Sequence, residues 1–405
     1  MNDKSKKTAK KTAKVKADDK RIDRLKELLR STPQDLDFER VRIMQEMYDE
    51  SAGDHALLQR AKFLAAVLDR KKLYIDDNLF VGAMAGKLNA LYTYPEWQVD
   101  WMIEEKTVEN SPTPEDKAAN QWAIDYWGPR GMKLRTEAIF EKRFGYDPKP
   151  CYNAGLIAAF HDWPAGGGNL NYPRVYREGL ASMIKEVEER QMALEMRMPN
   201  MTKFYFYEAS LIVMRAAIRY AHRYAELARE MAAKEKNAAR KAELISLAET
   251  CEWVPENPAR NLREAIQSHF FCHIIAELEQ IGCGYSEAYL GQNLDPYYQA
   301  DKAAGLITYD DAVFMFKNLT IKLNEINYYY GERIAKANSA DLGQSITLAG
   351  FSEDGGDATA EMDYVILDSS LYLALPQPPL SVALTPQTPG KFIEKVLDVI
   401  GTGIG

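Results

Sequence analysis

The fold is decided by residues 343–384, which read GQSITLAGFSEDGGDATAEMDYVILDSSLYLALPQPPLSVAL. Alternation places Ile346 and Leu348 on one face of a short strand near the start of this stretch. A glycine-rich loop follows, and Asp357 is positioned to cap a long helix. Closely spaced prolines end that helix, and residues 380–384 alternate again as a second strand. Two strands joined by a helix predict a βαβ crossover, the unit of α/β sheets and barrels.

The composition is that of an ordinary globular protein. The 405 residues are 46% apolar and 27% charged, which suits one large domain or two smaller ones. A net charge of −8, without a basic stripe in the folded part, argues against nucleic acid as the main partner. No apolar run approaches the ~20 residues that span a bilayer, and no apolar segment follows the N-terminal lysines as in a secretory signal.

The cysteines indicate a reducing compartment. Cys151, Cys251, Cys272 and Cys283 are widely spaced and match no zinc pattern. A disulfide framework is not expected in a chain of this size. We therefore expect a cytoplasmic protein.

Residues 1–20 are lysine-rich and have no apolar period, which predicts a disordered basic tail. A solvated tail is the simpler interpretation, and an arm for nucleic acid or membrane is the alternative. Residues 21–405 then form the folded part.

Capping residues and periodicity predict several helices. Thr113, with Pro114 next and acids in the first turn, marks a helix start, and Thr308 with Asp311 resembles a capping box. Apolar residues at helical spacing predict one amphipathic helix over residues 176–196.

His269 and His273 lie four residues apart, on one face of a predicted helix. The segment lacks the glutamate of HExxH, and no third ligand is spaced to fit. Packed or surface histidines are therefore favoured over a zinc pair.

Residues 151–180 contain a run of three glycines flanked by hydrogen-bonding side chains. This run is not a phosphate loop, because the strand–GxxxxGK[ST]–helix pattern and its lysine are missing. The polar side chains either line a ligand cavity or only satisfy the loop backbone. They are His161, Asp162, Trp163, Asn169 and Asn171.

With its glycine loop, DAT, long helix and QPPLSV, the stretch 343–384 resembles the middle of the glycyl radical enzymes. That family includes pyruvate formate-lyase, choline lyase, diol dehydratases, benzylsuccinate synthase and the arylacetate decarboxylases. The most family-specific run begins at Cys251 and matches the pattern C..VP..PAR.F.EA.Q through Gln267. Further agreement lies in residues 73–82, 151–180, 204–225 and 277–308.

The chain departs from the family pattern at two places. Several members have Asp-Tyr where this chain has Asn171 and Tyr172, so the carboxylate needed for acid–base chemistry at that point is missing. The Gly-Arg that many members carry is replaced by Ala288 and Tyr289. The second change favours the benzylsuccinate synthase and arylacetate decarboxylase branches.

The resemblance implies an α/β fold, with a helix-rich N-terminal part that leads into an incomplete ten-stranded barrel. It implies that the cavity loop binds substrate through His161, Asp162, Trp163, Asn169 and Asn171, with Tyr285 and Tyr289 contributing. No catalytic residue is assigned, because the radical cysteine and the radical glycine of the family lie beyond the matched part. No bound cofactor or metal is expected. A radical S-adenosylmethionine activating enzyme would install the glycyl radical on the missing C-terminal part.

Three functions are compatible with this resemblance. The first is a radical lyase acting on a small organic acid or aromatic compound, by arylacetate decarboxylation or by hydrocarbon addition to fumarate. The second is a dehydratase or lyase for diols or amino alcohols. The third is an inactive fragment that binds a partner barrel half, since the sequence reaches Gly405 without the cysteine and glycine motifs. We expect the complete protein to be a homodimer with no nucleic-acid or membrane partner. An unrelated helical scaffold is the remaining alternative.

Overall fold

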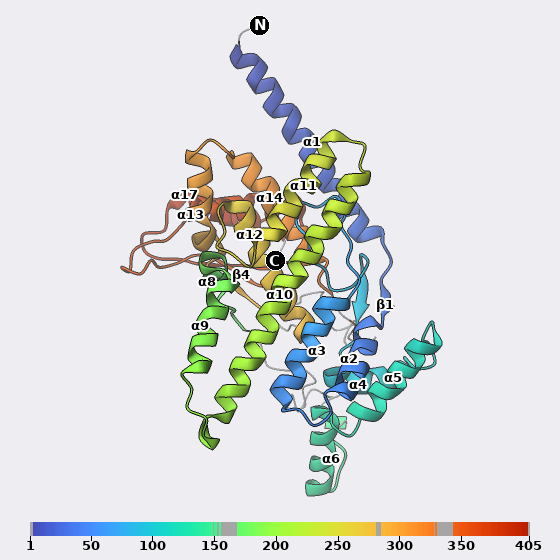
Figure 1. The fold of residues 1–405 in the computed structure, drawn as a ribbon. Helices are drawn as coiled ribbons and strands as arrows, with labels where there is room; N and C mark the ends of the chain where they lie inside the picture. The colour runs from blue at the N-terminus through green and yellow to red at the C-terminus, as the bar shows by residue number, and fades with distance from the viewer. Residues whose placement is uncertain are drawn as a thin grey trace.

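The computed structural model describes residues 3–148, 150–151, 154, 168–280, 285–327, 329 and 343–403, with side chains from Lys14 onward. The described chain is mostly helical and contains two small parallel sheets. In Figure 1, the start of α1 (Asp3–Ser31) extends away from the body, and the long α10 (Met201–Lys234) crosses the molecule. None of the described helices combines the length and the apolar composition that crossing a bilayer requires.

The larger sheet contains β3 (Glu287–Ala288), β4 (Ile346–Ala349) and β5 (Leu380–Ala383), in that order and all parallel. Helix α16 (Glu361–Leu373) connects β4 to β5, which confirms the predicted βαβ crossover. Gly168 forms a further parallel bridge to Tyr285, directly before β3. Within the described residues the larger sheet has three strands and is open, so the ten-stranded barrel is not confirmed.

The two faces of this sheet differ in chemistry. Glu287, Ile346 and Leu380 are in register and share one face, where Glu287 and Ile346 are buried. Ala288 and Thr347 share the opposite face. The first face is covered by helices and joins the main hydrophobic core, as the alternation of Ile346 and Leu348 predicted.

The N-terminal elements form a helical layer around a short ribbon of two parallel strands. Predicted capping is confirmed at α5, where the Thr113 side chain accepts a hydrogen bond from Asp116 N and Pro114 occupies the first turn. The elements are β1 (Asp35–Asp37), α2 (Glu39–Glu50), α3 (Ala56–Arg70), β2 (Ala90–Tyr92), α4 (Pro95–Glu104), α5 (Pro114–Trp127) and α6 (Met132–Phe144).

The middle of the chain supplies the long helices of the core. Helix α10 packs against α3, α9 and α11, and α12 lies under the larger sheet with both Phe270 and Phe271 fully buried. The elements are α8 (Tyr172–Glu178), α9 (Leu180–Met192), the 3₁₀ turn η1 (Met198–Asn200), α11 (Ala238–Trp253) and α12 (Leu262–Glu279).

The remaining helices pack around α16. They are α13 (Leu290–Ala303), α14 (Tyr309–Asn324) and α17 (Gly390–Ile400), each in contact with α16. The capping box predicted for α14 is present, since Thr308 Oγ1 accepts from Asp311 N and Asp311 Oδ2 accepts from Thr308 N.

The single helix expected over residues 176–196 is broken at Gly179 into α8 and α9. Gly179 has φ +75°, and a Cβ there would lie 2.5 Å from Glu256 O. Beyond the break, Leu180 N donates to Pro255 O at 2.9 Å. The proline-punctuated turn therefore occupies the space that a continuous helix would need.

The lysine-rich tail is helical rather than disordered, since residues 3–20 belong to α1. Alanine and lysine are good helix formers, which permits this conformation. Contacts with α14 fix its second half: Lys14 pairs with Asp311, and Lys317 Nζ lies 2.8 Å from Asp19 Oδ1. The ordering of residues 14–20 thus depends on tertiary contacts that composition does not reveal.

Asp357 does not cap α16. The helix begins at Glu361 with Ala360 at its N-cap, and Asp363 Oδ2 accepts from Ala360 N at 2.8 Å. Asp357 instead accepts from the hydroxyls of Thr385 (3.1 Å) and Thr388 (2.9 Å). It therefore ties the glycine-rich loop to the segment after β5.

Candidate functional site

A cavity of about 230 Å³ lies between residues 169–173, α8, α12, β3 and α13. Two of the predicted site residues, Asn169 and Asn171, line it. His269 and Glu287 also line it and are each 1% exposed. In Figure 1 the labels of α8, α12 and α13 gather around β4, and α8 and α13 both contact α12. This cavity is the candidate functional site.

Helix α12 positions two histidines beneath β3. Its N-cap is Asn261, whose side chain accepts from Glu264 N at 2.9 Å. His269 and His273 lie one turn apart, with ring planes 9° from parallel and ring centroids 6.4 Å apart. Both rings are buried, as expected for packed histidines.

His273 is held in one tautomer by its neighbours. Gln344 Oε1 lies 2.9 Å from His273 Nε2, and Gln344 Nε2 donates to Leu323 O, so the amide oxygen faces the ring. His273 Nε2 therefore donates, and His273 Nδ1 accepts from the Tyr172 hydroxyl at 2.8 Å. Burial lowers the pKa of His273, which favours this neutral form.

Glu287 faces both histidines from β3. Its Oε2 lies 3.1 Å from His269 Nε2, and its Oε1 lies 3.7 Å from His273 Nδ1. Burial opposes ionisation of this carboxyl, but His269 and His273 together more than offset that effect, so the pKa of Glu287 is lowered. The cavity thus contains an ionised carboxylate. Among the described residues, no group of three or more His, Cys, Asp or Glu side chains is arranged to hold a metal ion.

The two asparagines have different surroundings. Asn169 Oδ1 accepts from Ala288 N at 3.3 Å, which attaches the loop to the edge of β3. Asn171 is the N-cap of α8, yet its side chain makes no capping hydrogen bond. The Asn171 side chain thus lines the cavity without capping the helix.

Among the described residues, Tyr285 and Tyr289 were also predicted as site residues, and neither lines this cavity. Tyr285 lies beside it, where its hydroxyl accepts from Gln280 Nε2 at 2.5 Å. Tyr289 lies at the carboxyl end of β3 with φ 54°, an unusual conformation for an aromatic residue. A Cβ at Gly350 would come within 2.9 Å of the Tyr289 ring, so that ring covers the end of β4. His161, Asp162 and Trp163 fall outside the described residues.

Sequence reasoning did not identify Tyr176 and Glu287 as site residues. His269 was recognised only as one member of a histidine pair. The contact between α12 and β3 joins residues that are distant in sequence, and neither segment carries a pattern for it. A single glutamate in a strand of two residues does not predict a buried partner.

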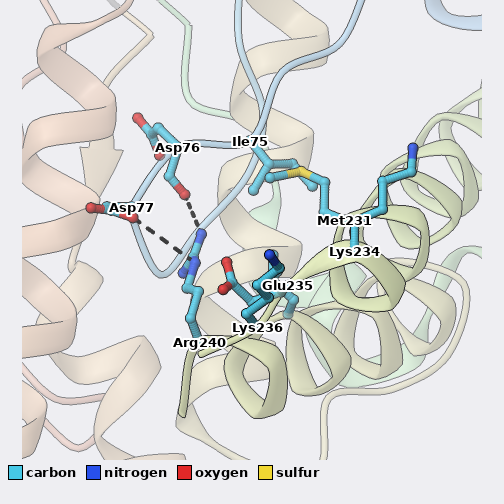
Figure 2. A pocket seen from close by; sticks show the side chains of 9 residues that line it. Ile75, Asp76, Asp77, Met231, Lys234, Glu235, Lys236 and Arg240 are labelled. Carbon is cyan, nitrogen blue, oxygen red and sulfur yellow. Dashed lines mark hydrogen bonds and ion pairs between the residues drawn. The ribbon is translucent and has the colours of Figure 1, made fainter. Parts of the chain in front are cut away.

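A larger groove, of about 680 Å³, lies between residues 75–77 and the connection from α10 to α11. Figure 2 shows Arg240 directed at Asp76 and Asp77, while Lys234 points away from them. Arg240 donates to Asp76 O, and its Nε lies 3.9 Å from Asp77 Oδ1. These charges are neutralised within the groove, which therefore resembles a salt-bridged surface more than a reaction site.

The comparisons with known proteins agree with one another. A family model described as "Pyruvate formate lyase-like" matches residues 11–405. Isethionate sulfite-lyase from Nitratidesulfovibrio vulgaris is 29% identical over 419 residues, covering 98% of this chain and 50% of that enzyme. (2S)-3-Sulfopropanediol dehydratase from Klebsiella oxytoca is 28% identical and covers 95% of this chain and 48% of that enzyme.

A solved structure gives the same result. The glycerol-bound, B12-independent glycerol dehydratase from Clostridium butyricum matches with a TM-score of 0.85 at 26% identity. The match covers 95% of this chain and 50% of that structure. The chain therefore spans about half the length of the curated relatives it matches.

These relatives correct one expectation. Ala288 and Tyr289 favour the benzylsuccinate synthase and arylacetate decarboxylase branches, but the relatives that match 91–98% of the chain are sulfite-lyases and dehydratases. An indoleacetate decarboxylase from Tractidigestivibacter scatoligenes, 30% identical, matches 69% of the chain. The loss of one arginine was thus a poor guide to the branch. The family model extends over nearly the whole sequence, and the chain therefore belongs to the pyruvate formate lyase-like family of glycyl radical enzymes.

Proposed function

We propose that this chain forms the N-terminal half of a glycyl radical eliminase. Such an enzyme would remove a leaving group, either hydroxyl as water or sulfonate as sulfite, from a small hydroxylated substrate. The observation that carries this proposal is that eliminating enzymes match 95–98% of the chain in sequence and in structure. The reactions of those relatives break a C–O or a C–S bond next to a hydroxyl-bearing carbon.

The radical chemistry belongs to the part of the family fold outside this chain. An activating enzyme of the radical S-adenosylmethionine class would install the glycyl radical there. In this proposal the described half shapes the wall of the substrate cavity. The Asn169 and Asn171 amides suit hydroxyl groups, because each amide offers both a donor and an acceptor.

Asn171 also limits the mechanism. An amide orients a hydroxyl group but does not exchange a proton with it at neutral pH. The proton transfers that accompany elimination must therefore use other groups.

The test uses the chain together with its natural continuation, produced and activated without oxygen. Electron paramagnetic resonance should show an organic radical after activation. Isethionate, (2S)-3-sulfopropanediol, glycerol and phenylacetate would then be supplied separately, with sulfite and carbonyl products measured. We expect turnover of at least one of the first three. Carbon dioxide from phenylacetate alone, or a stable radical with no turnover of any of the first three, would contradict the proposal.

A matched pair of variants tests the asparagine. Asn171→Ala should raise KM by roughly tenfold, as expected for loss of a hydrogen bond to substrate. Asn200→Ala, at the distant tip before α10, should leave KM unchanged. Equal effects of the two changes would remove Asn171 from the site.

A second candidate function is a non-catalytic half that binds a partner. It is favoured by an apolar groove of about 310 Å³ beside the outer edge of β5. In that case no radical would form under any activation conditions, and the natural continuation would lack the cysteine and glycine motifs.

A further inference from the structure

Gln344 is a fully buried side chain that reaches the wall of the candidate cavity through two other residues. It lies just before β4, and its amide nitrogen donates to Leu323 O in the last turn of α14 at 3.2 Å. Its amide oxygen lies 2.9 Å from His273 Nε2. His273 Nδ1 in turn lies 2.8 Å from the hydroxyl of Tyr172, which lines the cavity. These contacts connect the end of α14 to the cavity wall.

The direction of each hydrogen bond in this connection is determined by Gln344. A neutral imidazole carries one N–H, and the amide oxygen of Gln344 requires that this proton be on Nε2. Glu277 Oε1, which is 3.9 Å from His273 Nε2, favours the same arrangement. Nδ1 is then an acceptor and takes the hydrogen bond of the Tyr172 hydroxyl. Because that proton is committed to His273, the Tyr172 oxygen can only accept a hydrogen bond from a ligand.

Glu287 favours the opposite tautomer of His273. Its Oε2 pairs with His269, whereas its Oε1 lies 3.7 Å from His273 Nδ1 and makes no hydrogen bond within the described chain. A proton on Nδ1 would be attracted to this carboxylate oxygen. The Tyr172 hydroxyl would then lose its acceptor and could direct its proton into the cavity. The two tautomers therefore give the cavity wall opposite hydrogen-bonding character.

We propose that Gln344 is a positioning residue for the substrate. By holding the His273 proton on Nε2, it keeps Tyr172 and Glu287 as hydrogen-bond acceptors for a hydroxyl group in the cavity. This role rests on the proposed function, because it requires that the cavity receive a hydroxylated substrate. Burial raises the pKa of Tyr172 well above its ordinary value, so the phenol stays neutral and binds the hydroxyl group without removing its proton.

Nitrogen NMR of isotope-labelled histidine tests the tautomer. The chain with its natural continuation would be kept unactivated, and the His273 signals would be assigned by their loss in His273→Gln. In the wild type we expect the proton on Nε2. Gln344→Met keeps nearly the same shape without the amide and should move the proton toward Nδ1. Gln98→Met is the matched control: it replaces an equally buried glutamine on α4 and should leave the tautomer unchanged.

Kinetics of the activated enzyme test the effect on the substrate, with whichever of isethionate, (2S)-3-sulfopropanediol and glycerol turns over. Gln344→Met should raise KM roughly tenfold and leave kcat within about twofold, because the lost hydrogen bonds hold substrate and transition state alike. Tyr172→Phe should raise KM several-fold, which keeps the test valid if Gln344→Met does not fold. The two changes together should raise KM by less than the product of their separate effects, since they act on one hydrogen bond. Gln98→Met should leave KM unchanged.

Several results would overturn the proposal. A wild-type His273 protonated on Nδ1, or an unchanged tautomer in folded Gln344→Met, would remove the control by Gln344. A changed tautomer with an unchanged KM, or a Tyr172→Phe variant with wild-type KM, would make the role of Gln344 only structural. If no substrate turns over, the affinity of the unactivated protein for glycerol, measured by isothermal titration, takes the place of KM, and absence of binding would also overturn the proposal. Because the NMR and titration need no turnover, failure of the proposed elimination is distinguished from failure of this inference.

Discussion

Glu96 lies between two arginines in the interior of the N-terminal layer. Its Oε1 is 2.5 Å from Arg40 Nη2 and 2.7 Å from Arg60 Nη1. Arg40 is completely buried, and its guanidinium lies 3.9 Å from the centroid of the Tyr94 ring. Arg60 also pairs with Glu279 at the end of α12. This network thus connects α2, α3 and α4 to the helix that carries the candidate site.

We predict that Glu96→Gln lowers the free energy of unfolding by about 3–5 kcal/mol, because it leaves a buried arginine without its counter-charge. Burial opposes ionisation of Glu96, but Arg40 and Arg60 lower its pKa from 4.5 to about 2. Between pH 2 and 4.5, the native state therefore binds fewer protons than the unfolded chain. Stability should therefore fall as pH falls from 4.5 toward 2, and this loss should be smaller in Glu96→Gln.

Urea unfolding measured at several pH values checks both parts of this prediction. Glu353→Gln provides the control, since its carboxylate is exposed. If the free energy of unfolding fell in parallel with pH in the wild-type protein and in Glu96→Gln, the Glu96 carboxylate would not be the source of the acid dependence.

At the scale of elements, α13 and α16 approach so closely that only glycine fits at position 291. A Cβ on Gly291 would lie 1.9 Å from Asp363 Oδ1 and 2.6 Å from Asp363 Cγ. Asp363 cannot easily move away, since its Oδ2 accepts from Ala360 N at the start of α16. The helix start and the helix contact therefore depend on the same side chain.

We predict that Gly291→Ala costs about 1–3 kcal/mol of unfolding free energy, although alanine is the better helix former. Asp363→Ala should relieve the overlap, so that the two changes together cost less than their sum. Thermal or urea unfolding of the four members of this double-mutant cycle measures the coupling. Gly390→Ala is the matched control, because an added Cβ there meets nothing within 4 Å. Additive effects of the two substitutions would contradict the overlap.

The elements that could be predicted from sequence are those with local causes. The caps at Thr113 and Thr308 follow from residues within one turn, and the alternation of Ile346 and Leu348 reports their burial directly. The break at Gly179 could not be predicted in this way, because its cause is a turn some 75 residues later. The candidate site follows the same rule. Asn169 and Asn171 could be predicted because they flank a run of glycines, whereas the pairing of His269 with Glu287 could not, because it depends on tertiary packing.

At the scale of the whole molecule, the larger sheet is open at β5. Within the described residues, β5 pairs only with β4, so its outer edge has unpaired backbone groups. The groove beside this edge is lined by apolar side chains of α16, β5 and α17. Leu384, Leu397 and Ile400 there are 56%, 58% and 64% exposed. An unpaired edge next to exposed apolar side chains is a surface prone to association.

We predict that the 405-residue chain, produced by itself, self-associates through this surface. Leu397→Glu places a charge in the groove and should weaken self-association by at least roughly tenfold, because burying an unpaired carboxylate is unfavourable. Sedimentation velocity over a range of concentrations would measure the change. Leu306→Glu is the matched control, since Leu306 is 71% exposed in the turn between α13 and α14, away from the groove. A monomeric wild-type chain, or equal effects of the two variants, would contradict the assignment. If the natural continuation of the family fold covers this groove, its addition should suppress self-association of the wild type and have less effect on Leu397→Glu.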